Sequence, residues 1–237
     1  MRNLFPWLIC VLLLASCAQH YEIAGNSFLE AKGKSMLYLN LTTDGVQHSC
    51  IDSCEVIHGE FSLSGDVDSI MMAHLFLGNQ RVMPIVLEDG KMDVQISNAF
   101  KYVKGGPLND RLYGFIRKKE QLENDLWELE RKCMCMLRDG KDVEEVRAYY
   151  ARKEKKLSKE LEDLETDFIT DNYENVLGTG IFMILCNQYP SPVMTEQISK
   201  ILHRAPSVFR SNPFVQSYER RARGGACKCC EEEKDKK

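Results

Sequence analysis

The sequence has little excess of charge of either sign. It contains 31 Lys and Arg against 35 Asp and Glu, which gives a formal net charge of -4 over 237 residues. Proteins that bind nucleic acid use a surplus of Lys and Arg to contact phosphates, so this balance excludes that class. The sequence also lacks a glycine-rich phosphate loop, a nucleophile elbow and an HExxH motif. Its five histidines show no ligand spacing, and no cofactor is predicted.

Long apolar runs are absent after Gln19. The next most apolar segment, Ile181 to Cys186, lies between Gly180 and Asn187 and is too short to cross a bilayer. It therefore predicts a buried piece of helix. We expect a protein that is anchored to a membrane and does not span it.

The N-terminal segment has the features of a bacterial lipoprotein signal. Arg2 precedes an apolar run from Leu4 to Leu14, and the run ends in Leu14-Ala15-Ser16-Cys17, which resembles a lipobox. In such proteins a signal peptidase cuts before the cysteine, and several acyl chains then hold the protein at the membrane. We predict a signal peptide over residues 1–16 and lipidation at Cys17. The alternative is an ordinary secretory signal with Cys17 as an incidental thiol.

The residues after the lipobox bear on location. Ala18 is not an acidic retention residue, and Gln19–Glu22 lacks the acidic run that resembles a surface-export signal. The expected location is the outer membrane, facing the periplasm. The expected partners are the membrane, through the lipid anchor, and an envelope protein of unknown identity.

Residues 17–105 are predicted to form a β domain. The segment holds short runs rich in β-branched, aromatic, Leu and Met residues, often alternating with polar ones and separated by Gly or Asp. Asp89-Gly90 between two alternating runs predicts a hairpin. Strands of this length and spacing predict an antiparallel sandwich or curled sheet. The predicted strands are 21–24, 35–41, 55–57, 60–64, 69–77, 82–88, 92–97 and 100–103.

Residues 106–223 are predicted to be helical, which gives an α+β fold class. Pro107 follows two glycines and suits the first turn of a helix, where the missing N–H has no partner to lose. Two apolar stripes with helical spacing follow, broken only at Lys119 and Lys153 and separated by Asp139-Gly140. They predict an antiparallel helical hairpin, with mixed charges on its solvated face. Shorter helices are predicted over 176–188, 195–204 and 214–222, and the charged tail 224–237 is predicted to be disordered.

The β region, the joint over residues 81–110 and the following helices resemble the DUF4369 domain over roughly residues 20–223. This domain is common in lipoproteins of the Bacteroides group, usually before the thioredoxin domain of TlpA/ResA-like thiol-disulfide oxidoreductases. The resemblance implies a fold but no chemistry, and the Trp-Cys-x-x-Cys motif of those oxidoreductases is missing here. The matching residues are Tyr21-Glu22-Ile23-Ala24-Gly25, Gly59, Phe61, Gly65, Pro84-Ile85-Val86-Leu87-Glu88-Asp89-Gly90 and Gly105-Gly106-Pro107-Leu108-Asn109-Asp110.

Cysteines supply the candidate chemistry within the chain. Cys50 and Cys54 flank a predicted loop, so a small disulfide ring is one interpretation and incidental thiols are the other. Cys133 and Cys135 are two apart on a helix and point about 200° from each other, so they cannot bond to each other. Cys133 and Cys186 are predicted core residues.

The tail motif Cys227-Lys228-Cys229-Cys230 has the formal C-x-x-C spacing, and three thiols within four residues could hold a soft metal. The glutamates at 231–233 disfavour the thiolate, and no fourth ligand for zinc lies nearby. Two hypotheses follow. The first is a non-catalytic binding or scaffold module of the envelope, and the second is a thiol-based role as redox partner or soft-metal site through the tail.

Overall fold

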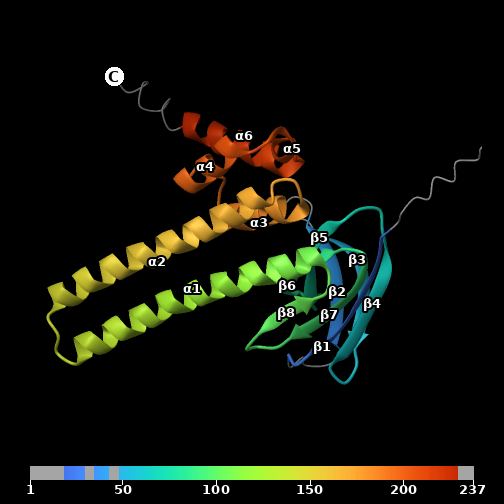
Figure 1. Cartoon of the computed structure of the whole chain (residues 1–237), viewed down its shortest axis with the longest axis horizontal. Coiled ribbons are helices and arrows are strands. Elements are labelled where there is room, and N and C mark those ends of the chain that lie inside the picture. Colours follow the sequence, from blue (N-terminus) through green and yellow to red (C-terminus); the bar gives the residue numbers. More distant parts are fainter. Residues whose placement is uncertain (1–18, 30–34, 43–47, 229–237) are drawn as a thin grey trace, which may run out of the picture.

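The computed structural model describes residues 19–29, 35–42 and 48–228. Eight strands come first in these ranges and six helices follow, which confirms the α+β class (Figure 1). The strands form two four-stranded sheets, with orders β4-β1-β7-β8 and β3-β2-β5-β6. Their bounds are β1 Gln19–Ser27, β2 Ser35–Thr42, β3 His48–Val56, β4 Glu60–Val67, β5 Met71–Leu77, β6 Gln80–Leu87, β7 Gly90–Ile96 and β8 Lys101–Lys104.

Burial alternates along β4 and β7 as the sequence predicted, whereas β5 and β6 bury runs of consecutive residues. In β4, Phe61, Leu63 and Val67 are buried while most of their neighbours are exposed. The inward side chains of both sheets join one hydrophobic core, which also takes in residues from the helices. The most completely buried strand residues include Ile23, Leu37, Leu39, Leu75, Ile85, Leu87, Met92 and Ile96.

The predicted hairpin at Asp89-Gly90 is wrong. β6 ends at Leu87 in one sheet, and β7 begins at Gly90 in the other. β7 instead pairs in parallel with β1, so Gly25 lies opposite Val94, and this is a departure from an all-antiparallel arrangement. The Asp-Gly turn sets only the local backbone, with φ of 103° at Gly90. Which strand pairs with which depends on β1, a segment about 70 residues away that local sequence cannot indicate.

The helices include the predicted long hairpin. α1 spans Pro107–Arg138 with Pro107 in its first turn, and α2 spans Val143–Asp171. The two helices lie side by side and project far from the sheets (Figure 1). No helix of the described ranges is long and apolar enough to cross a membrane. The remaining helices are α3 Val176–Cys186, α4 Glu196–Arg204, α5 Ser207–Arg210 and α6 Pro213–Lys228.

Two details of the C-terminal helices differ from the prediction. The short α5 was not predicted, and α6 continues through Lys228, beyond the expected boundary at residue 223. Residues 224–228 are therefore helical and do not belong to a disordered tail. Residues 229–237 lie outside the described ranges.

The hairpin has two packing regions. Near the sheets, Phe115 of α1 stacks on Phe168 of α2, with ring centroids 4.2 Å apart, and joins the main core. Further out, a separate small cluster centres on Leu129, Cys133 and Val146. Cys133 is thus buried in the seam, as predicted, and Cys186 is buried in the main core.

The joint between the sheets and α1 depends on a buried carboxylate. Glu88, which follows β6, is only 4% exposed and accepts hydrogen bonds from the backbone N–H groups of Leu108 (3.2 Å) and Asn109 (2.8 Å). These donors belong to the first turn of α1, where backbone N–H groups have no helical partner and where a negative charge is favoured. Gly106, the residue before the helix, has no side chain that could cap it.

Asn109 completes the joint with its side chain. Its Oδ1 accepts from the N–H of Val86 at 3.0 Å, while its Nδ2 donates to the carbonyl of Val86 at 2.8 Å and to Glu88 Oε1 at 3.0 Å. β6 is an edge strand, so this amide occupies the hydrogen-bonding groups that a further strand would use. A glycine is required at position 106. The φ of Gly106 is 85°, and a Cβ added there would lie 2.2 Å from Glu88 Oε1.

Replacing Asn109 should destabilise the whole protein. Asn109→Leu leaves the N–H and carbonyl of Val86 buried without partners, so we expect a loss of about 3 kcal/mol in the free energy of unfolding. Chemical denaturation followed by circular dichroism measures it. Asn124→Leu makes the same change at an exposed position of α1 and should cost less than about 0.5 kcal/mol. Equal effects of the two substitutions would contradict this account of the joint.

Candidate functional site

Two of the cysteines singled out from the sequence, Cys50 and Cys54, lie on one strand. Cys50 and Cys54 both lie on β3, and both are free thiols. The predicted loop between them is a strand, so their Cα atoms are roughly 13 Å apart at the usual rise per residue. A disulfide requires Cα atoms within about 7 Å. Of the two interpretations, this strand fits incidental thiols and does not fit a small disulfide ring.

The other candidate thiols are Cys17, Cys227, Cys229 and Cys230. Cys227 falls within α6. Cys17, Cys229 and Cys230 lie outside the described residues. Among the described residues, no group of three or more His, Cys, Asp and Glu side chains is arranged to hold a metal ion.

A second candidate site lies between β8 and the first turns of α1. This β8–α1 groove has a volume of about 580 Å³. Phe100 and Tyr102 contribute a stacked aromatic pair with ring centroids 6.1 Å apart, and they are 51% and 37% exposed. The lining residues are Phe100, Lys101, Tyr102, Val103, Lys104, Asp110, Tyr113, Ile116, Arg117 and Glu120.

The lining shows how the groove runs. The residues that line the groove include all four residues of β8. Successive side chains of a strand point to opposite faces of its sheet. The groove therefore follows the edge of β8 and does not lie over one face. In the sheet order β4-β1-β7-β8 this strand is terminal, so one of its edges has no strand partner within the described residues.

Tyr113 fixes the floor of the groove. Its hydroxyl donates to the carbonyl of Pro84 at 2.6 Å, which ties α1 to β6. Burial, with a smaller contribution from the charge of Glu120, raises the pKa of Tyr113 far above its ordinary value. The phenol is therefore protonated at neutral pH and serves as a fixed donor to the backbone.

A second, smaller hollow of about 230 Å³ lies beside the same stretch of α1 and shares Ile116 and Glu120 with the groove. Its walls are mostly apolar, but Lys119 and Glu165 border it. The lining residues are Pro84, Phe115, Ile116, Lys119, Glu120, Glu123, Glu165, Ile181, Ile184, Leu185 and Gln188.

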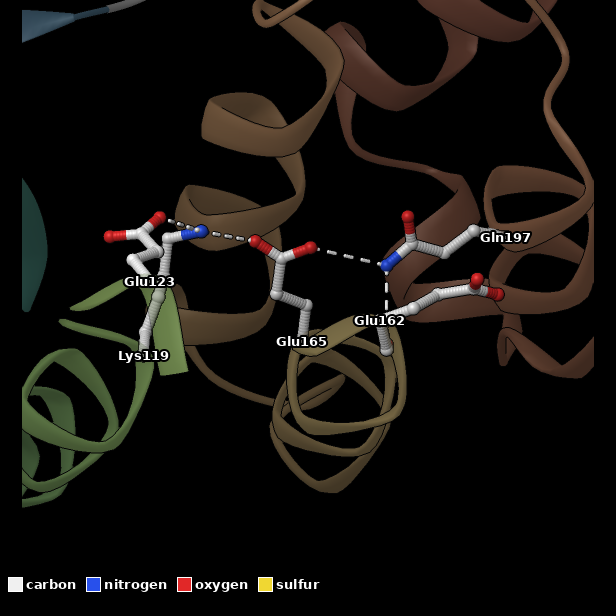
Figure 2. A network of polar contacts seen from close by, with 5 residues as sticks. All are labelled: Lys119, Glu123, Glu162, Glu165 and Gln197. Carbon is white, nitrogen blue, oxygen red and sulfur yellow. Dashed lines mark hydrogen bonds and ion pairs between the residues drawn. The ribbon is translucent and has the colours of Figure 1, made fainter. Parts of the chain in front are cut away.

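Glu165 is the centre of a polar network that joins three helices (Figure 2). One carboxylate oxygen is 2.6 Å from Lys119 Nζ, on α1, and the other accepts from Gln197 Nε2, on α4, at 3.3 Å. Gln197 Nε2 also donates to the carbonyl of Glu162, and Lys119 contacts Glu123 at 3.0 Å. Glu165 is buried, so its charge depends on these partners.

The charge of Lys119 is also held by this network. Burial alone lowers the pKa of Lys119, but the hydrogen bonds and charges of Glu165 and Glu123 outweigh it and raise the pKa above 10.5. The lysine therefore remains protonated at neutral pH. It acts as a fixed cation in the wall of the small hollow and is not available as a base.

The sequence carried only part of the information needed to find these residues. Lys119 interrupts the apolar stripe of α1, and that interruption was visible in the spacing. No sequence pattern indicates that Glu165 and Gln197 are buried, because charged and amide residues are frequent on the exposed faces of helices. For Phe100 and Tyr102 the sequence predicts a strand and does not indicate a groove.

Removing one partner of the ion pair should be costly. Lys119→Met leaves the buried Glu165 carboxylate without its cation, and we expect a loss of about 3 kcal/mol in the free energy of unfolding. The double variant Lys119→Met/Glu165→Leu removes both charges and should recover most of this loss. Lys159→Met breaks the exposed pair with Asp163 and should cost less than about 1 kcal/mol.

The effect of Lys119→Met should depend on pH in one direction. Because the folded pKa of Lys119 is raised, its contribution is fully present below 10.5 and is lost as the pH rises through the folded pKa. The difference in stability between the wild type and Lys119→Met should therefore shrink in strongly alkaline solution. A constant difference across that range would show that the ion pair is not its source.

Comparison with known proteins gives one match. No curated protein and no solved structure matches the chain significantly. Residues 21–112 match a family model described as a domain of unknown function, DUF4369. The match runs from β1 into the first turns of α1, and Glu88 and Asn109 both fall within it. The sequence-based resemblance to the DUF4369 domain is therefore confirmed for residues 21–112.

Proposed function

We propose that the protein is an envelope lipoprotein that acts as a non-catalytic binding module and takes an extended segment of a partner protein in the β8–α1 groove. The observation that carries the proposal is the groove itself. It combines an exposed aromatic pair with the terminal edge of a sheet. An unpaired strand edge binds an extended peptide through main-chain hydrogen bonds, and neighbouring side chains then select its sequence.

The walls of the groove are suited to specific binding. One wall is a strand and the other is a helix whose first turn is fixed by Glu88 and Asn109, so little order has to be gained when a partner binds. Lys101, Lys104 and Arg117 line the groove together with Asp110 and Glu120. This mixture favours a peptide that carries charges of both signs around an apolar residue, because each charge can meet its opposite.

The anchoring part of the proposal rests on sequence alone. The lipobox-like Leu14-Ala15-Ser16-Cys17 and the short apolar run before it support a lipid-anchored protein at the outer membrane, facing the periplasm. A tethered binding module in that compartment is consistent with a groove that recognises another envelope protein.

Selection of peptides tests the groove. Random peptides displayed on phage and selected on the immobilised protein should include binders, because the groove accepts extended chains. The double variant Phe100→Ala/Tyr102→Ala should weaken these binders at least ten-fold, since aromatic contacts dominate such interfaces. Val208→Ala removes an exposed apolar residue on α5 and should leave them unchanged. Binders that ignore the Phe100/Tyr102 substitutions would contradict the proposed site.

Lipidation is tested separately. Cys17→Ser removes the thiol that accepts the lipid, so the precursor should accumulate uncleaved or the protein should be released in soluble form. Partition between detergent and aqueous phases, together with the mass of the product, measures both. A neighbouring substitution, Ala18→Ser, should be processed normally. Detergent partition and mass identical to those of the wild type would contradict lipidation at Cys17.

A further inference from the structure

The outer half of α1 exposes two large apolar side chains that no described part of the chain covers. Trp127 is 58% exposed and Met134 is 68% exposed. They are seven residues apart, nearly two helical turns, and therefore lie on the same face of the helix. The buried seam residues Leu129 and Cys133 lie roughly on the opposite side, toward α2. No other described helix or strand runs along this outer half of the hairpin (Figure 1).

Charged residues around this pair follow a mirrored order. Glu123 lies four residues before Trp127, and Arg138 lies four residues after Met134. Between the two apolar residues, Glu130 lies three after Trp127 and Arg131 lies three before Met134. Reversing the direction of the helix therefore exchanges Trp127 with Met134 and each glutamate with an arginine.

We propose that this face of α1 binds the same face of a second copy of the protein, with the two helices antiparallel. The two-fold axis passes between Glu130 and Arg131. Trp127 of one copy then packs against Met134 of the other, and Glu123 of one copy comes level with Arg138 of the other. The interface is isologous, and it does not use the β8–α1 groove, so it goes beyond the proposed binding function.

Charge selects this arrangement over its alternatives. A parallel pair would set Glu123 against Glu123 and Arg138 against Arg138, and like charges in contact are unfavourable. The apolar contact is also suitable, because a thioether packs favourably against an aromatic ring. The face carries two glutamates beside its two arginines, so it has no net positive charge to attract an anionic membrane surface.

The contacts that these residues make within one copy do not prevent the pairing. Arg131 bonds Glu128 at 2.9 Å and lies over the Trp127 ring at 5.3 Å, while Glu123 contacts Lys119. Glu130 accepts from the Tyr150 hydroxyl at 3.5 Å, and Arg138 lies 3.8 Å from Asp139. The side chains of Arg131 and Glu123 remain 63% and 50% exposed. The Arg131–Glu128 pair is exposed on both sides and contributes little to stability, and half of the Glu123 side chain stays open to a second partner.

Complementary charge reversal tests the proposal. The full chain is purified in detergent as the wild type, as Glu123→Arg/Glu130→Arg, and as Arg131→Glu/Arg138→Glu, and sedimentation measures its association. The wild type should form dimers, and each variant alone should lose them. An equimolar mixture of the two variants should form dimers again, because opposite charges then meet across the axis. Glu144→Arg/Arg147→Glu reverses an exposed pair on α2 and should leave the dimer intact.

Trp127 provides a second measurement. The only other tryptophan, Trp7, lies in the predicted signal peptide, so emission from the processed protein reports on Trp127. Emission should shift to shorter wavelength as dimers form, and Met134→Ala should weaken association at least ten-fold. Three results would overturn the proposal: a monomeric wild type, variants that remain dimeric alone, or a mixture that stays monomeric. An emission shift of a monomer on added lipid vesicles would assign the face to membrane and also overturn it.

Discussion

The carboxylate of Glu88 holds the first turn of α1 against the end of β6, and the positions of the groove and the hairpin depend on this contact. The carboxylate satisfies two N–H groups at the start of the helix, and Asn109 bonds both backbone groups of Val86. Glu88, Asn109 and Val86 are buried, so these groups cannot turn to water if the contact breaks. The joint therefore fixes both the starting point and the direction of a helix of 32 residues.

A fixed first turn has consequences along the whole helix. Near the joint, α1 forms one wall of the groove beside β8, and the hydroxyl of Tyr113 ties the same wall to Pro84. Beyond the main core, the two helices are held together by the small cluster around Leu129, Cys133 and Val146 and by contacts of Lys132 with Tyr149 and of Tyr150 with Glu130. The outer half consequently has few buried side chains, and Trp127 and Met134 are left on its surface.

Polar contacts supply specificity where the apolar seam alone would not. Lys119, Glu165 and Gln197 connect α1, α2 and α4, and a helix shifted along its neighbour by one turn would leave the Glu165 charge unpaired in the interior (Figure 2). Apolar side chains would tolerate such a shift better, because their contacts have little directional preference. The network therefore sets the register of helices that the hydrophobic stripe brings together.

The sequence by itself determined the class of most segments, although it missed α5 and most of β3. Period-two burial in β4, the position of Pro107 in α1, and the two stripes that end in Met136 and Phe168 follow from side-chain spacing along one element. Only the tertiary structure decided the pairing of β7 with β1, the extension of β3 through Cys50 and Cys54, and the burial of Glu88 and Glu165. The reason is physical: these features join residues far apart in the chain, and a polar residue is buried only where distant partners complete its hydrogen bonds.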